Sequence, residues 1–305
     1  MITIKILIFG GTGFIGERLI ELLTIKQNEV VVMTRNIERA KAKFGDKVQA
    51  CTWEKTLAPC DELNNVDVVI NLTGESIGSG RWTKAKKEEI LNSRVRTTRA
   101  IVDAIERGVF QPKTLINASA VGYYGFQTVG QITEDHPAGD DFLANVCVIW
   151  EQEARKAEAF GLRVAILRTG VVLGSGGGAL RQMALPYKFF LGGPIGSGKQ
   201  WMSWIHIDDL INIIDNLINN EHIEGPVNAT APNPVTMNEF SKTLGEILGK
   251  PYIFNVPAFS MKLLLGEMAD MLVNGQQVIP KKLIDTGYDF KYPILSKALK
   301  EIFLD

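Results

Sequence analysis

The chain has 305 residues, of which 46% are hydrophobic and 22% are charged, so it can bury a large core and is not a disordered polypeptide. Its formal net charge of -1 provides no general attraction to nucleic acid or to an anionic membrane surface. Because no apolar stretch has the length of a membrane span and the first residues lack a signal-peptide pattern, we expect a cytoplasmic protein.

The cysteines and histidines indicate neither disulfides nor a metal site. The three cysteines form no C-x-x-C pair, which is typical of reduced thiols in the cytoplasm. The three histidines lack the spacing of metal ligands. The residues concerned are Cys51, Cys60, Cys147, His136, His206 and His222.

The first predicted element is a buried strand over Ile4–Phe9, followed directly by a glycine-rich turn and a helix over Phe14–Leu23. Gly10 permits the tight turn, Gly13 lets a pyrophosphate approach the backbone, and Gly16 lets the helix pack closely on the strand. A helix that begins on glycines offers free N–H groups and its positive dipole end to a phosphate. The pattern therefore predicts a dinucleotide-binding unit.

Strands and helices then alternate, which predicts a doubly wound parallel Rossmann sheet of the α/β class. The expected strands are Glu29–Asn36, Val48–Trp53, Val66–Leu72, Lys113–Ala118 and Arg163–Leu167. The expected helices are Ile37–Phe44, Thr83–Glu106 and Asp140–Phe160.

The pattern changes after Gly174, where we expect a smaller, mostly helical substrate lobe. Glycine clusters at 175–178 and 192–198 flank an apolar segment and are consistent either with loops over a site or with ordinary turns. Thr236 and Glu239 form a capping box that predicts a helix start. We expect residues 1–174, with 201–230 returning to them, to form the nucleotide-binding domain, and 175–200 with 231–305 to form the substrate or lid lobe.

The end of the second strand predicts which coenzyme is bound. NAD sites usually carry a carboxylate there, about 20 residues beyond the glycines. This chain has Thr34 and Arg35 instead. A guanidinium pairs with the 2′-phosphate of NADP, which a carboxylate would repel, so we expect NADP (as NADPH) and not NAD. The alternative is that Arg35 is an ordinary surface charge.

A set of motifs spread over nearly the whole chain points to a family. These motifs are Gly10–Gly16, Asn71–Ile77, Arg81–Thr83, Ser93–Thr98, Ala118–Gly125, Arg168–Gly174, Gly192–Gly198, Trp204–Asp209 and Gly275–Lys282. With them the chain resembles the extended short-chain dehydrogenase/reductase superfamily, and within it the atypical epimerase-family (YfcH-like) branch with its C-terminal tail domain, here about 257–305. The resemblance implies a Rossmann fold, NADP binding, and a substrate pocket between the sheet and the C-terminal lobe.

The resemblance also implies roles for individual residues. Thr34 and Arg35 would lie at the 2′-phosphate, and Arg94 would place a cation near the cofactor unless it is an exposed helix arginine. The residues implied at the pyrophosphate and along the fourth strand are Thr12, Gly13, Phe14, Ile15, Leu72, Thr73 and Gly74.

The usual Tyr-x-x-x-Lys pair of this superfamily is missing. In ordinary members the lysine assists the tyrosine in proton transfer while hydride moves to or from nicotinamide. No tyrosine of this chain has a lysine four residues later. With Glu151 as the marker of the helix that carries the pair, its two positions hold Leu143 and Cys147.

Two functions remain open. The chain is either an NADP-dependent oxidoreductase or epimerase with a rearranged acid/base group, or an NADP(H)-binding sensor without turnover. In the first case Ser119 would polarise a substrate carbonyl and Tyr123 or Tyr124 would donate a proton, unless these tyrosines only pack the loop.

For three further residues the sequence gives weaker evidence of a part in substrate binding or catalysis. Glu75 and Arg81 are candidates for substrate contacts or for a structural ion pair. His206 is expected to be structural. The substrate is an unknown small molecule, and both a monomer and a homodimer remain open.

Overall fold

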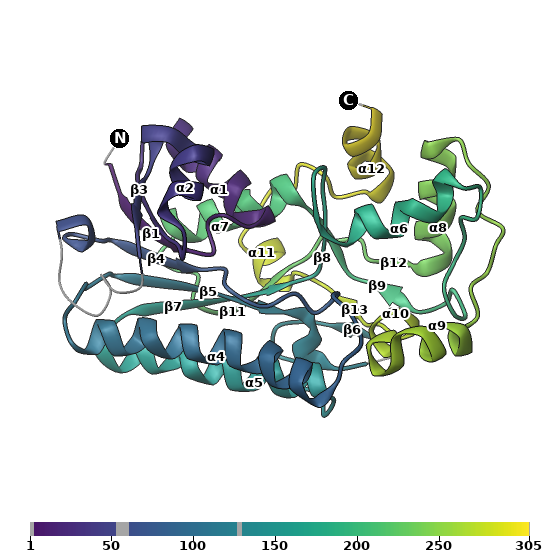
Figure 1. Ribbon diagram of the computed structural model, residues 1–305, viewed down its shortest axis with the longest axis horizontal. Coiled ribbons are helices and arrows are strands. Elements are labelled where there is room, and N and C mark those ends of the chain that lie inside the picture. The colour runs from purple at the N-terminus through teal and green to yellow at the C-terminus, as the bar shows by residue number, and fades with distance from the viewer. Residues whose placement is uncertain (1–2, 53–60, 127–129, 305) are drawn as a thin grey trace.

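The computed structural model describes residues 3–52, 61–126 and 130–304, and its centre is a seven-stranded sheet in which every neighbouring pair is parallel (Figure 1). The strand order is β11-β7-β5-β4-β1-β2-β3. The bounds are β1 Lys5–Phe9, β2 Glu29–Met33, β3 Gln49–Cys51, β4 Val68–Asn71, β5 Thr114–Ala120, β7 Arg163–Thr169 and β11 Gly225–Ala229. The predicted doubly wound parallel sheet is confirmed.

Helices cover both faces of this sheet, which explains why its strands are apolar on both sides (Figure 1). Helices α1 and α7 pack together on one face, and α4 and α5 pack together on the other. The helices of this layer arrangement are α1 Phe14–Ile25, α2 Ile37–Phe44, α4 Lys84–Glu106, α5 Phe142–Arg155 and α7 Ile207–Asn219. Ile6, Leu7 and Ile8 of β1 are fully buried between the two layers.

The observed elements differ from the predicted ones mainly at their ends. The third strand is shorter than expected, and its predicted last residue, Trp53, lies outside the described residues. Thr83 is the N-cap of α4, where its hydroxyl accepts the N–H of Lys86 at 3.2 Å. The helix predicted over Asp140–Phe160 is α5 followed by a 3₁₀ turn over Lys156–Phe160.

The C-terminal region is helical, as predicted, and lies at the carboxyl ends of the sheet strands (Figure 1). Its helices are α6 Gly178–Lys188, α8 Met237–Leu248, α9 Ala258–Leu265, α10 Asp270–Val273, α11 Lys281–Asp285 and α12 Leu295–Leu304. Short strand pairs connect them: β8 Val171–Leu173 with β10 Trp204–His206, β9 Trp201–Met202 with β12 Val235–Thr236, and β13 Gln277–Val278 with β6 Gln131–Ile132. Thr236 caps α8 by accepting the N–H of Glu239 at 3.2 Å.

The end of the chain returns to the Rossmann sheet. Leu283 and Phe290 belong to the hydrophobic core that also contains α1 and α7. The Asp209 carboxylate accepts the N–H groups of Lys291 and Tyr292 at 2.8 and 2.9 Å, which ties this segment to the start of α7. The tail therefore contacts both parts of the fold.

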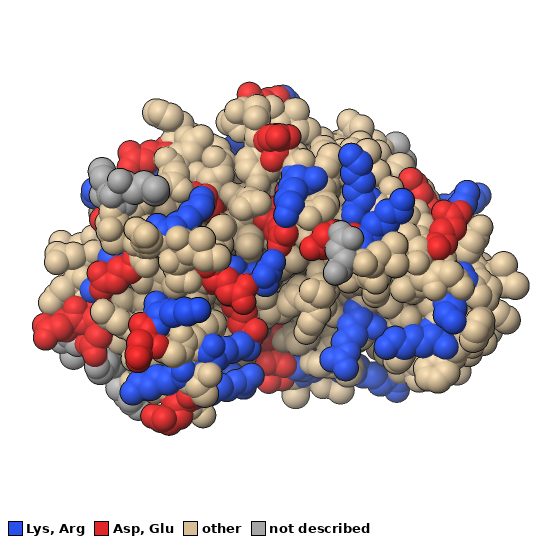
Figure 2. Space-filling model, turned by 90° about the horizontal axis from the view of Figure 1, so that it is seen from above, with Lys and Arg blue, Asp and Glu red and all other residues tan. Residues whose placement is uncertain are grey.

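Charges of both signs are interspersed over the face seen from above (Figure 2), in keeping with the net charge of -1. None of the helices in the described residues combines the length and the hydropathy needed to cross a bilayer.

Candidate functional site

The N-terminus of α1 follows the carboxyl end of β1 with its backbone donors uncovered. Gly13 is the N-cap residue, and no side chain caps this helix. The N–H groups of the first turn therefore have no partner within the helix, and the positive end of the helix dipole lies beside them. Thr12 and Ile15 are half-buried on either side of Gly13. This arrangement suits a pyrophosphate.

Glycine is required at two positions of this turn. Gly10 has φ +81°, and a Cβ there would lie 2.9 Å from the carbonyl carbon and oxygen of Leu72. A Cβ on Gly16 would lie 2.5 Å from the Gly10 oxygen. The close approach of Gly10 brings the α1 turn against Leu72 and Thr73, so these predicted cofactor residues lie together at the edge where β1 and β4 end. Thr73 is held there because its N–H and hydroxyl both bond to Asn71 Oδ1.

The side chain of Phe14 packs below the glycine-rich segment that follows β8. The positions that a Cβ would take on Gly174, Gly177 and Gly178 lie 3.1, 2.7 and 3.0 Å from atoms of its ring or side chain. The segment we expected as a loop or turn therefore docks on Phe14 and continues into α6. The backbone of Phe14 belongs to the first turn of α1, where the pyrophosphate is predicted, and its ring packs against the segment after β8.

Thr34 and Arg35 follow β2 at the same edge. The Thr34 hydroxyl accepts the N–H of Asn36 at 3.1 Å and fixes the turn into α2. Arg35 is exposed, and in the described part of the chain its side chain has no hydrogen bond or ion pair. Its guanidinium is therefore available to a ligand.

Arg94 reaches the same edge from α4. A Cβ on Gly74 would lie 3.0 Å from Arg94 Cζ, so the guanidinium lies directly against the backbone after β4. Its Nη1 donates to the carbonyl oxygens of Glu75 and Ile90 at 3.1 and 2.9 Å, and its Cζ is 5.2 Å from the ring centroid of Trp150. No carboxylate among the described residues forms an ion pair with it. Burial lowers the pKa of Arg94, but a guanidinium stays charged at neutral pH.

Ser119 lies in register with Arg168 and Asn228 across β5, β7 and β11. Ser119 is 5% exposed, and its hydroxyl donates to Glu151 Oε1 at 2.7 Å. Arg168 binds the same carboxylate twice, from Nε to Oε1 at 2.9 Å and from Nη2 to Oε2 at 2.8 Å. Although burial opposes it, this pairing raises the pKa of Arg168 above its ordinary value. The Ser119 hydroxyl proton is thus hydrogen-bonded to the carboxylate of the buried Glu151–Arg168 ion pair.

The two tyrosines of the loop after β5 have different environments. Tyr124 is fully buried and donates to Asn228 Oδ1 at 2.6 Å while accepting from Arg168 Nη1 at 3.0 Å. Burial raises the pKa of Tyr124 to about 12. Tyr123 is half-buried, with its ring centroid 3.4 Å from Arg168 Cζ. In the described residues no group forms a hydrogen bond with the Tyr123 hydroxyl, whereas the Tyr124 hydroxyl has two partners.

Leu143 and Cys147 lie on the first turns of α5, next to this loop. A Cβ on Gly122 would lie 3.4 Å from Leu143 Cβ and 3.9 Å from Cys147 Sγ. Burial raises the pKa of the Cys147 thiol to about 11, so the thiol is neutral. Neither residue can supply the proton transfer of a tyrosine or the charge of a lysine.

The remaining candidates have structural contacts. Glu75 forms an ion pair with Lys86 at 2.7 Å, and Arg81 donates to the carbonyl oxygen of Leu263 at 2.6 Å. His206 caps α7 and lies 2.8 Å from Glu301, in keeping with the structural role expected for it. In the described residues no three His, Cys, Asp or Glu side chains are grouped as a metal site.

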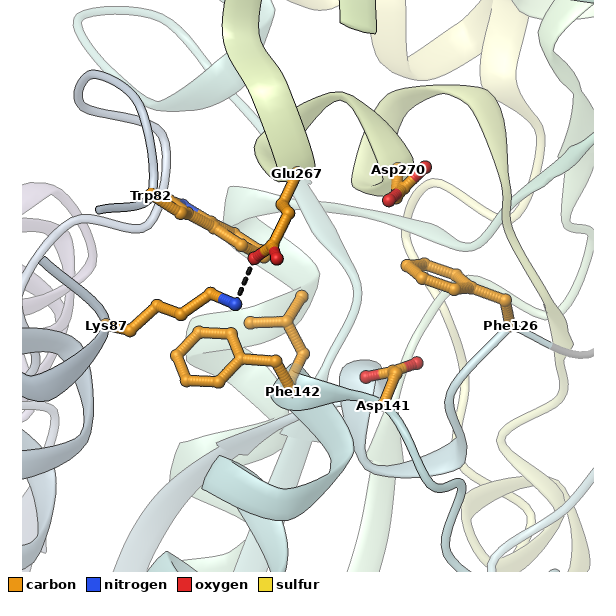
Figure 3. Close-up of a pocket in the computed structure, with 8 residues that line it drawn as sticks. Trp82, Lys87, Phe126, Asp141, Phe142, Glu267 and Asp270 are labelled. Carbon is orange, nitrogen blue, oxygen red and sulfur yellow. Dashed lines mark ion pairs between the residues drawn. The ribbon is translucent and has the colours of Figure 1, made fainter. Parts of the chain in front are cut away.

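A cavity of about 260 Å³ lies beside Leu143, between the start of α4, the start of α5 and the C-terminal tail (Figure 3). Its lining residues are Trp82, Lys87, Phe126, Asp141, Phe142, Leu143, Glu267 and Asp270. Sequence reasoning did not find this cavity, because its residues come from segments far apart in the chain. It also used Glu151 only as a marker and missed its pairing with Arg168.

Comparison with known proteins agrees with this geometry. Residues 6–229 match the model of the NAD dependent epimerase/dehydratase family, and residues 256–302 match a domain of unknown function, DUF1731. The chain is 44% identical to the epimerase family protein YfhF of Bacillus subtilis, over 97% of each chain. It is 41% identical to the chloroplastic epimerase family protein SDR39U1 homolog of Arabidopsis thaliana, over 96% of this chain and 85% of that protein.

Solved structures of related proteins share the fold of this chain. The human epimerase family protein SDR39U1, solved with NADPH, superposes with a TM-score of 0.88 and 37% identity, over 98% of this chain and 99% of the other. A UDP-glucuronic acid 4-epimerase from Bacillus cereus shares the fold at a TM-score of 0.78 and 19% identity, over 98% of both chains. The glycine turn, the parallel sheet and these matches together place the chain in the NAD dependent epimerase/dehydratase family.

Proposed function

We propose that this protein is an NADP-dependent oxidoreductase of the extended short-chain dehydrogenase/reductase type that works without a Tyr-x-x-x-Lys pair. The observation that carries the proposal is the coenzyme edge of the sheet. There the uncapped N-terminus of α1 and the uncommitted guanidinium of Arg35 follow neighbouring strands. The human relative solved with NADPH, at 37% identity, supports NADP as the coenzyme.

Replacing Arg35 with Asp is expected to weaken NADPH binding by about 10- to 100-fold, because a charge-assisted pair with the 2′-phosphate is replaced by repulsion. NADH binding should change little. Fluorescence titration with both coenzymes measures the ratio. The matched control is Arg96→Asp on the exposed side of α4, which changes the charge equally and should leave the ratio unchanged. A wild-type ratio in Arg35→Asp would remove Arg35 from the site.

NADPH supplies a hydride when it is bound. In this proposal Tyr123 gives its proton to the oxygen of the substrate carbonyl as the carbon becomes reduced. The stacked guanidinium of Arg168 holds the Tyr123 ring in place, and the Glu151–Arg168 pair fixes the Ser119 hydroxyl. Ser119 can still accept a hydrogen bond, so it orients the product alcohol or a water molecule.

Arg94 supplies the positive charge that a lysine would otherwise bring. Its guanidinium lies beside the backbone of Gly74 and over Trp150 of α5, one turn after Cys147. In the described residues Arg94 donates hydrogen bonds only to two carbonyl oxygens, so its other N–H groups can bind hydroxyl or phosphate oxygens of the coenzyme.

Tyr123→Phe is expected to lower kcat by about 100-fold or more while the KM for NADPH stays unchanged, because only the proton donor is removed. The assay follows nicotinamide absorbance with a panel of carbonyl compounds. Tyr252→Phe, another half-buried tyrosine without a hydroxyl hydrogen bond in the described residues, is the matched control. Full activity in Tyr123→Phe would exclude Tyr123 as the donor.

The competing function is that of an NADP(H) sensor. It is favoured by Ser119, whose proton is already bound to Glu151. Tight NADPH binding without oxidation by any carbonyl compound in the same assay would establish the sensor and refute the enzyme.

A further inference from the structure

The aromatic and charged side chains that line the cavity of about 260 Å³ beside Leu143 indicate which class of ligand it binds (Figure 3). Leu143 contributes to its wall, and Leu143 also packs against Gly122, the residue before Tyr123. Leu143 therefore connects the wall of the cavity with the segment that carries the proposed proton donor.

Aromatic side chains form much of the wall. The rings of Trp82 and Phe142 meet edge to face, with centroids 5.3 Å apart and an interplanar angle of 65°. The indole is held in place because Trp82 Nε1 donates to the carbonyl oxygen of Ile77 at 2.9 Å. Phe126 points into the cavity from the side opposite Trp82 (Figure 3). Walls of this kind favour a flat apolar ring between them.

The charges at the cavity are mostly negative. Lys87 is the cation in the lining, and it is already committed, because it forms an ion pair with Glu267 and lies 5.0 Å from the Phe142 ring centroid (Figure 3). Asp141 caps α5 by accepting the N–H of Ala144 at 2.9 Å, and Asp270 pairs with Lys262 at 2.9 Å. The lining therefore carries three carboxylates and one ammonium, and Lys262, which pairs with Asp270 from outside the lining, reduces the excess of negative charge to one. An anionic group entering the cavity would meet this excess and no uncommitted cation of the described lining.

We propose that this cavity is the substrate site and that it takes a small molecule built on one aromatic ring, neutral or cationic, whose carbonyl is reduced to an alcohol; this rests on the proposed function. Size and charge both disfavour a nucleoside diphosphate sugar. The volume is below the common range of about 300–1,000 Å³ for ligand sites, and no uncommitted cation in the described lining could bind the two phosphates.

The reaction balances without a further reagent. One hydride passes from NADPH to the carbonyl carbon, the carbon–oxygen π bond breaks, and its electron pair takes the proton of Tyr123. The carbonyl is reduced, NADPH is oxidised to NADP⁺, and the tyrosine regains its proton from solvent.

The substrate class can be tested without turnover by measuring how probe molecules bind to the protein loaded with NADP⁺. The probes are benzyl alcohol, para-trimethylammoniobenzyl alcohol, para-carboxybenzyl alcohol and UDP-glucose, compared by ligand-observed NMR titration. The cationic ring alcohol is expected to bind about 10-fold more tightly than the carboxylate, since repulsion acts across a partly buried site. Trp82→Ala should weaken binding of all three ring alcohols.

Asp270→Asn is expected to reduce the preference for the cationic ring several-fold. Asp285→Asn removes a carboxylate that is paired to Lys281 on α11, away from the cavity, and should leave the preference unchanged. Equal or tighter binding of the carboxylate, absence of ring binding, or tighter binding of UDP-glucose would overturn this inference.

The same experiment separates the two proposals. If the ring alcohols bind with the expected preference but the corresponding aldehydes leave NADPH unoxidised, the proposed oxidoreductase activity fails and the ligand class stands. If UDP-glucose is instead oxidised with NADP⁺ in a reaction that needs Tyr123, the activity stands and the ligand class fails.

Discussion

Arg168→Met is expected to lower the free energy of unfolding by about 3–5 kcal/mol, measured by urea denaturation. Both side chains of the Arg168–Glu151 pair are nearly fully buried, at 3% and 5% exposure. Methionine fills the volume of the arginine stem but leaves the Glu151 carboxylate without its cation in a site with little water. The Ser119 hydroxyl and the Tyr123 ring lose their fixed positions with it.

The ion pair of another glutamate on α5 provides the control. Arg99 of α4 binds Glu153 at 3.1 Å, but the Arg99 side chain is 55% exposed, and Glu153 also pairs with Lys156 at 2.9 Å. Arg99→Met should therefore cost at most about 1 kcal/mol. The double variant Glu151→Leu with Arg168→Met should be more stable than Arg168→Met alone, because no charge is left unpaired. A cost below about 1 kcal/mol for Arg168→Met would show that the pair does not act as described.

Gly16→Ala is expected to weaken NADPH binding by about 10- to 100-fold and to lower stability by about 1–3 kcal/mol. Alanine is a better helix former than glycine, so helix propensity alone predicts stabilisation. The new Cβ, however, would lie 2.5 Å from the Gly10 oxygen and 2.6 Å from the Gly11 Cα. These are backbone atoms, so α1 must move away from the turn that presents its N–H groups.

Gly78→Ala is the matched control, because a Cβ at Gly78 meets no atom within 4 Å and its φ lies outside the left-handed region. It should bind NADPH like the wild type. Wild-type affinity in Gly16→Ala would mean that the close packing of α1 on its glycine turn is not needed for the coenzyme.

The order and type of the Rossmann elements could be predicted because the signals are local. Buried parallel strands are apolar runs, and the helix starts carry capping residues such as Thr83 and Thr236. The ends of β3 and α5 were less predictable, since strand length depends on the pairing with β2 and helix ends often tighten into 3₁₀ turns. The return of Leu283 and Phe290 to the sheet has no local signal at all.

The candidate site, like the fold, has parts that local sequence predicts and parts that depend on tertiary structure. The coenzyme residues stay a prediction, which rests on the glycine spacing and on Arg35 and so needs only the sequence of single segments. The pairing of Glu151 with Arg168 depends on the register of β5 and β7 and on the rotation of α5, which sequence alone does not contain. Our proposal of Tyr123 rather than Tyr124 rests on the difference in burial between them, which the sequence does not show because the two residues are adjacent and chemically identical.

Isothermal titration of the wild-type protein with NADPH and with NADH is the most direct test of coenzyme binding at the glycine turn of α1. We expect one NADPH site per chain, with NADPH binding at least about 10-fold more tightly than NADH because Arg35 pairs with the 2′-phosphate. Absence of heat with both coenzymes, under conditions where the protein is folded, would rule out the proposed coenzyme site. Tighter binding of NADH would contradict the assignment of Arg35.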